Sequence, residues 1–349
     1  MRGFFLRATA ALYLSAGAGC ASAAEMQGIC TRAVAEAVAI SNGEFEARFS
    51  LNTGRLIFFG PEGGQNLLWV NSDRGLEEYH RRKPTAYLNF GGEKLWPIAQ
   101  CRWRDAFGKE WPPPAALEGA PWRELCRTKR SLTVESAPIP ALHLVITREF
   151  TLSPTGAELL VRNRLRRVAA SPFPVLVWSI AQLPMPEFCV LELPADPPEF
   201  IEYTARGYAE AVAGKRLVRQ GICKEAEGAK SGTRGSFVAA VYPDGTIFLQ
   251  CHMAVRGGCY PENASIQAYS NPYYIELETL DEQLPLLPGE EREATTVWKF
   301  FDSGLLHPEG EELADLLEHE VGKLKSRVFR TDAEPGKTSP LILKAENSR

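Results

Sequence analysis

The chain has 349 residues, of which 45% are hydrophobic and 23% are charged, as in an ordinary globular protein. A formal net charge of −4 argues against a nucleic-acid partner, and no run of like charge is long enough for a polyanion or membrane-surface site. The sequence contains no P-loop, GxGxxG, CxxC, HxxxH or HExxH pattern, so it predicts neither a nucleotide cofactor nor a metal ion.

The first 24 residues have the features of a secretory signal peptide. Arg2 and Arg7 accompany an apolar run from Ala8 to Ala18, and small residues follow up to Ala24. The run is much shorter than the roughly 20 residues that cross a bilayer, and no later segment predicts a membrane span. We therefore expect a periplasmic or secreted protein, with lipidation at Cys20 as the alternative.

Seven cysteines follow this leader: Cys30, Cys101, Cys126, Cys189, Cys223, Cys251 and Cys259. In an exported protein such cysteines predict disulfides, and an odd count leaves one thiol over. Proximity in the sequence suggests three pairs, although sequence does not fix the connectivity. The pairs are Cys251 with Cys259, Cys101 with Cys126, and Cys189 with Cys223.

Residues 25–330 are predicted to form one β-rich domain. Alternating apolar residues predict a first hairpin from residues 44–51 and 55–59, and a second from residues 141–152 and 157–168. Further strands are expected at residues 174–183, 236–242, 246–253, 273–279 and 293–301. Such antiparallel strands indicate a sandwich or barrel, and the loop-rich stretches 104–124 and 203–234 are predicted to be insertions that shape a cleft.

One segment, His307 to Val328, has the apolar spacing of a helix. Its acidic residues lie near the start and its basic residues near the end, as the helix dipole prefers. We expect this helix to cover the sandwich. The polar tail, residues 331–349, has little to bury and is predicted to be disordered.

The segment from Leu88 to Gln100 combines a Gly-Gly pair, a charged pair and a tryptophan. Glycines permit close backbone approach, and tryptophan presents a flat apolar face with one N–H donor. This combination suits sugar recognition, with Trp96 stacking on a ring while Glu93 and Lys94 bind hydroxyl groups. The alternative is an ordinary turn that carries a core tryptophan.

Several segments resemble galactose-mutarotase-like (aldose 1-epimerase-like) proteins. These are Gly54–Gly60, Asn66–Asn71, the Gly91–Pro97 turn, Leu277–Leu280 and Leu284–Glu290. The pattern is closest to a branch of that superfamily marked by Asn89–Pro97, Trp111–Pro113 and Trp178–Gln182. The resemblance implies an all-β supersandwich of two large antiparallel sheets with a C-terminal helix and a sugar cleft on a concave face.

Opening a pyranose ring requires a base and an acid. The resemblance assigns the base to Glu278, and strand alternation places Tyr274, Glu276 and Glu278 on one face. If this face is shielded from water, repulsion between the two carboxylates raises the pKa of one of them. The alternative is that these residues lie on a solvent-facing strand edge with no catalytic role. The family's acidic histidine is missing, because the equivalent stretch contains Trp178, and His252 is the first substitute to test.

Two hypotheses follow. In the first, the protein binds a sugar or oligosaccharide with weak or absent mutarotase activity. The residues expected to bind are Asn89, Glu93, Lys94, Trp96, Gln100, Trp178, Gln182 and Glu276. In the second, it is an aldose-epimerase-like or other carbohydrate-processing enzyme with Glu278 as the base. No cofactor, no nucleic acid and no membrane span is expected under either hypothesis.

Overall fold

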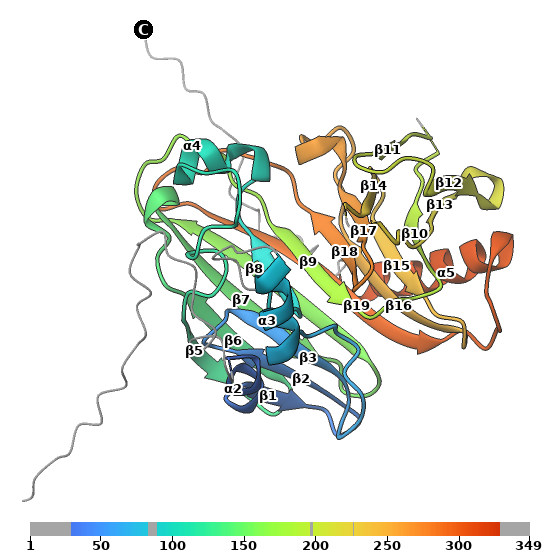
Figure 1. The fold of residues 1–349 in the computed structure, drawn as a ribbon, viewed down its shortest axis with the longest axis horizontal. Helices are drawn as coiled ribbons and strands as arrows, with labels where there is room; N and C mark the ends of the chain where they lie inside the picture. Colours follow the sequence, from blue (N-terminus) through green and yellow to red (C-terminus); the bar gives the residue numbers. More distant parts are fainter. Residues whose placement is uncertain (1–28, 83–88, 196–197, 226, 329–349) are drawn as a thin grey trace, which may run out of the picture.

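The computed structural model describes residues 29–82, 89–195, 198–225 and 227–328. The predicted leader, Cys20 and the predicted tail lie outside these residues. Nineteen strands in the described part form two large antiparallel sheets, which confirms the all-β class (Figure 1).

The first sheet has nine strands, and each is antiparallel to its neighbours. Its strand order is β1 (Val38–Ser41), β2 (Phe45–Ser50), β3 (Arg55–Pro61), β4 (Glu93–Trp96), β9 (Trp178–Leu183), β18 (Ile275–Leu280), β17 (Ile266–Ser270), β14 (Ala229–Thr233) and β11 (Phe200–Glu202). Strands β4, β9 and β18 lie in the middle, so distant parts of the chain meet there.

The second sheet has ten strands. Its order is β12 (Ala209–Val212), β13 (Leu217–Gln220), β10 (Phe188–Glu192), β15 (Phe237–Val241), β16 (Thr246–His252), β19 (Glu291–Asp302), β8 (Glu158–Arg167), β7 (Leu144–Leu152), β6 (Ser131–Ser136) and β5 (Trp122–Arg127). Side chains such as Phe59, Phe248 and Trp298 fill the space between the two sheets.

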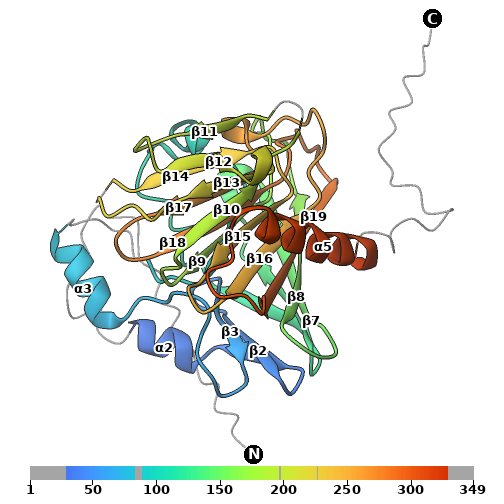
Figure 2. The same cartoon turned by 90° about the vertical axis from the view of Figure 1, so that its right-hand side faces the viewer.

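The helices lie outside the sandwich (Figure 2). They are α2 (Ile29–Ala35), α3 (Asp73–Arg82), α4 (Trp103–Phe107) and α5 (Gly310–Val328), with short 3₁₀ turns η1 (Gln100–Arg102), η2 (Pro140–Leu142), η3 (Ala213–Lys215) and η4 (Pro261–Asn263). Helix α5 packs Leu313, Leu317 and Leu324 onto the outer face of the ten-stranded sheet. None of the helices in the described residues is long and apolar enough to span a membrane.

Most of the predicted elements are confirmed. Both predicted hairpins form, as β2–β3 and β7–β8, and the predicted helix is present but begins at Gly310 rather than His307. The prediction of a loop-rich stretch over residues 203–234 was wrong, because this stretch contains β12, β13 and β14. These strands have only four or five residues and include glycine and charged side chains, so they lack a clear alternating pattern.

The predicted disulfides are also not formed. All seven cysteines after the leader are free thiols, and Cys30, Cys189, Cys223 and Cys251 are buried. Cys251 packs with the apolar residues of the ten-stranded sheet and α5, whereas its suggested partner Cys259 is exposed. Proximity in the sequence therefore did not predict disulfide pairing.

We expect the thiols to titrate in two groups. Cys101, Cys126 and Cys259 are exposed and should react with a thiol reagent in the folded protein. Burial raises the pKa of Cys189 and of Cys251 to about 12, so these thiols should react only after unfolding. Titration in denaturant without reductant should detect all seven; a count lower by two or more would indicate a disulfide.

Candidate functional site

The Gly-Gly pair lets the segment before β4 pack directly against neighbouring backbone. Gly91 and Gly92 have φ of +82° and +74°. A Cβ atom at Gly91 would lie 2.4 Å from the Trp69 carbonyl oxygen, and one at Gly92 would lie 2.3 Å from that of Leu56. Asn89 supports the turn, because its Oδ1 accepts the Gly91 N–H at 3.3 Å. Asn89 and both glycines thus position β4, and the close approach is to protein rather than to ligand.

Alternation along β4 sends its two charged residues to opposite faces. Glu93 is fully buried between the sheets, where Oε1 accepts from Arg148 Nη2 at 2.6 Å and from the Ser179 hydroxyl at 2.8 Å. Lys94 lies on the outer face of the nine-stranded sheet, with Nζ 3.9 Å from Glu276 Oε1. The structure therefore separates Glu93 from the other predicted binding residues, and Glu93 joins the two sheets instead.

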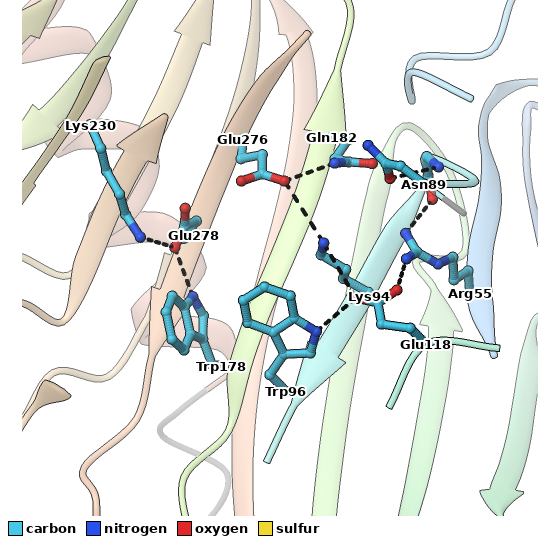
Figure 3. Close-up of polar contacts among 11 residues, drawn as sticks. Arg55, Asn89, Lys94, Trp96, Glu118, Trp178, Gln182, Lys230, Glu276 and Glu278 are labelled. Atoms are coloured by element: carbon cyan, nitrogen blue, oxygen red, sulfur yellow. Dashed lines mark hydrogen bonds and ion pairs between the residues drawn. The ribbon is translucent and has the colours of Figure 1, made fainter. Parts of the chain in front are cut away.

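Glu278 lies on the outer face, in the middle of the nine-stranded sheet (Figure 3). Its Oε2 accepts the indole N–H of Trp178 at 2.7 Å and lies 3.2 Å from Lys230 Nζ. Lys230 Nζ also lies 3.6 Å from Glu262 and 4.9 Å from the centre of the Trp178 ring. Trp178 and Lys230 thus fix the carboxylate on two sides.

The environment of Glu278 changes its proton affinity. Burial raises its pKa, the charge of Lys230 lowers it, and the neighbouring carboxylates Glu276 and Glu262 raise it; together these effects give a pKa of about 7. Burial opposes the charge on Lys230, yet the three glutamates hold the pKa of Lys230 above its ordinary value of 10.5. At neutral pH the site therefore contains a cation beside a carboxyl group that can accept or release a proton.

A second polar group lies next to Glu278 on the same face. Glu276 Oε1 accepts from Gln182 Nε2 at 2.7 Å, and its side chain is 15% exposed, compared with 2% for Glu278. Lys94 joins Glu276 to Glu118, whose Oε1 lies 3.4 Å from Nζ, and Glu118 is also paired with Arg55 (Figure 3). Glu276 is thus the more accessible carboxylate.

Trp96 occupies the interior of this region rather than an open surface. Its side chain packs edge-on against Trp103 and Trp178, at ring-centre distances of 4.7 and 5.3 Å, and the residue is 5% exposed. Its indole N–H donates to Glu118 Oε1 at 2.8 Å. The structure therefore supports the alternative of a core tryptophan, and Trp178 is buried in the same cluster.

An aromatic row that the sequence analysis did not predict as a binding surface borders Glu276. The rings of Trp69 and Tyr274 lie 4.5 Å apart, and those of Tyr274 and Tyr269 lie 6.4 Å apart. Tyr269 is directly opposite Glu276 in the β17–β18 register, and all three aromatic side chains are partly exposed. Partly exposed aromatic faces beside polar groups suit a ligand with apolar C–H faces and hydroxyl edges.

His252 and Gln100 do not join this cluster. His252 is opposite Thr296 in the ten-stranded sheet, and the Thr296 hydroxyl contacts that of Thr279 across the sandwich. His252 therefore points between the sheets, away from the face that carries Glu278. Burial lowers its pKa to about 4, so it is neutral. Gln100 lies in η1 and makes no hydrogen bond to the cluster within the described chain.

The sequence analysis missed several residues of the site. Lys230 lies in β14, within a stretch predicted to be a loop. Glu118 lies in an irregular segment, and Glu262 lies in the short 3₁₀ turn η4. Alternation within β14, where Lys230 and Gly232 share a face, is the signal that could have placed Lys230. Among the described residues there is no group of three or more histidine, cysteine, aspartate or glutamate side chains that could hold a metal ion.

Three solved structures are similar to this chain. A galactose mutarotase-like protein from Lactobacillus casei matches 76% of this chain and all of its own, with a TM-score of 0.53 and 10% identity. A galactose mutarotase related enzyme from Lactobacillus acidophilus matches 78% of this chain and all of its own, with a TM-score of 0.49 and 10% identity. A TPR-domain containing protein from Parabacteroides distasonis matches 78% of this chain over 47% of its own, with a TM-score of 0.51 and 15% identity.

No protein-family model matches the sequence, and no curated protein does. The similarity to the Lactobacillus casei structure shows that the chain has the galactose-mutarotase-like fold, at 10% sequence identity. The expected supersandwich is confirmed. At such identities the likeness establishes the fold and not an activity.

The raised pKa of Glu278 predicts a pH dependence of stability. A carboxyl group with a folded-state pKa of about 7, above its ordinary 4.5, favours folding fully below pH 4.5, and this contribution is lost as the pH rises to 7. Glu278→Gln should remove the loss, which is on the order of 3 kcal/mol. Urea unfolding of both proteins between pH 4 and pH 8 measures it; parallel pH profiles would contradict the assignment.

Proposed function

We propose that this protein is an exported carbohydrate-binding protein with weak or absent mutarotase activity, which binds its ligand on the outer face of the nine-stranded sheet at Glu276. The main support is the meeting of Glu276 and Glu278 on that face with lysine, amide and aromatic side chains. Carboxylates and lysines bind hydroxyl groups by charge-assisted hydrogen bonds. Export rests on the sequence features of residues 1–24 alone.

The accessible part of the site supports this ligand class. Glu276 is hydrogen-bonded by Gln182 and lies opposite Tyr269, so a sugar ring could lie against the aromatic row while its hydroxyls reach the carboxylate. Glu278 and Trp178 lie beneath this surface and hold Lys230 in place. A largely preformed site of this kind orders few side chains on binding, which favours affinity.

Mutarotation requires a general acid as well as a base, so a suitable proton donor distinguishes an enzyme from a binding protein. Efficient acid catalysis needs a group with a pKa near the working pH. Lys230 lies beside Glu278, but its pKa is raised above 10.5, which makes it a strong cation and a poor acid. His252 is on the inner side of the sandwich. The alternative, an enzyme with Glu278 as base, is favoured by the pKa of Glu278 alone, which is about 7.

Calorimetric titration and polarimetry together test the proposal. We expect a saccharide from a panel of neutral and acidic mono- and oligosaccharides to bind, and Glu276→Gln to weaken binding about tenfold or more, the effect of losing one hydrogen bond to a charged group. Glu293→Gln is the matched control, because Glu293 is an exposed carboxylate on β19 of the other sheet, paired with Arg164.

The two hypotheses give opposite results by polarimetry. Under the binding hypothesis, the protein accelerates glucose or galactose mutarotation little or not at all at neutral pH. Robust turnover that Glu278→Gln abolishes would establish the enzyme instead. If no saccharide binds and no turnover occurs, the fold has been kept without its sugar function.

A further inference from the structure

A pocket of about 780 Å³ lies outside the Glu276 site, where the ends of β10, β14, β15 and β16 meet the last turn of α5. Its volume is within the range of small-molecule sites, roughly 300 to 1,000 Å³. We propose that this pocket binds an amphipathic organic anion, whose charged group contacts Arg234 and Lys325 and whose apolar part lies against Met253, Val255 and Ile201. Nothing in the proposed carbohydrate site requires it.

Neutral groups hold the two cations in the pocket wall. Arg234 donates from Nε to Asn263 Oδ1 at 3.1 Å and from Nη1 to the Gly258 carbonyl oxygen at 3.1 Å. Lys325 Nζ donates to the Ser236 hydroxyl at 2.5 Å. Neither side chain forms an ion pair with a carboxylate of the described residues. A fixed cation with neutral partners keeps its charge available to an incoming anion.

The acidic residue that shares Ser236 with Lys325 is already engaged. Glu192 Oε2 accepts both the backbone N–H of Ser236 at 2.5 Å and its hydroxyl at 2.6 Å. The Ser236 hydroxyl therefore connects Lys325 to Glu192 and fixes both. Across the whole lining, Arg234, Arg256 and Lys325 face Glu192 and Glu199, which leaves an excess of one positive charge.

One wall of the pocket is apolar and accessible. Met253 and Val255, in the segment after β16, are 51% and 49% exposed, and Ile201 in β11 lines the same space. Exposed aliphatic side chains beside fixed cations match a ligand with an anionic head and a hydrocarbon chain or ring.

The fluorescent anion 8-anilinonaphthalene-1-sulfonate tests the proposal with the full chain. We expect octanoate to displace the probe, and octanol, with the same apolar chain and no charge, to displace it far less. Lys325→Met should weaken probe binding about tenfold or more, as loss of a hydrogen bond to a charged group does. Lys323→Met is the matched control, because Lys323 lies on the same helix outside the pocket, paired with Glu320.

A variant of the apolar wall keeps the test valid if changes to the cations disturb folding. Val255→Asp places a negative charge on an exposed side chain, so it should leave the melting temperature unchanged and weaken probe binding at least tenfold. Equal affinity in wild type, Lys325→Met and Val255→Asp, or octanol competing as well as octanoate, would overturn the proposal. Saccharide titration of Lys325→Met should be unchanged, which separates this site from the one at Glu276.

Discussion

Glu93→Ala should lower the free energy of unfolding by roughly 3 to 5 kcal/mol, because it leaves Arg148 as an uncompensated charge between the two sheets. Both side chains of this ion pair are fully buried. Chemical denaturation of wild type and variant measures the loss. The control is Glu293→Ala, since its exposed partner Arg164 stays in water and the expected change is below about 1 kcal/mol.

This variant also decides the role of Glu93. The sequence pattern predicted that Glu93 binds a sugar hydroxyl, whereas the structure places it on the inner face. If Glu93→Ala reduced saccharide affinity and left the unfolding free energy within about 1 kcal/mol of wild type, the structural role would be wrong.

Trp96→Ala should destabilise the protein by roughly 3 to 5 kcal/mol, as expected for removing a buried tryptophan. The side chain fills the space between Trp103 and Trp178 and donates its N–H to Glu118. Trp111→Ala is the matched control: Trp111 also stacks on Trp103 but is 47% exposed, so its loss should cost much less. Unfolding midpoints of the two variants give the comparison.

The stability and the saccharide affinity of Trp96→Ala together distinguish a core role from a stacking role. A Trp96→Ala protein that unfolds like wild type but no longer binds a saccharide would restore the stacking role predicted from the sequence. A destabilised protein that, below its melting temperature, keeps its affinity would place Trp96 in the core.

The sequence predicted the fold class well because long strands carry strong patterns. The β7–β8 hairpin alternates over about ten residues on each side of a Ser-Pro-Thr-Gly turn, and α5 repeats leucine at helical spacing. The short strands β12, β13 and β14 have too few residues to show an alternating pattern. They form because they pair with neighbouring strands in the folded sheets. The site depends on one of these, since β14 carries Lys230.

The sequence predicted only part of the candidate site. Strand alternation accounts for the part that it did predict. Alternation placed Glu276 and Glu278 on one face, and register then brought Gln182 opposite Glu276 and Trp178 within reach of Glu278. Along β4 the pattern could not tell which face is outside, because both of its faces are buried. Glu93 was therefore given a role that its face does not permit.

A crystal structure of the complex with a saccharide selected by calorimetry tests the central claim most directly. The proposal predicts a sugar ring beside the aromatic row of Trp69, Tyr274 and Tyr269, with a hydroxyl within about 3 Å of a Glu276 oxygen, the distance of a hydrogen bond. A saccharide bound elsewhere, with the outer face at Glu276 empty, would contradict it.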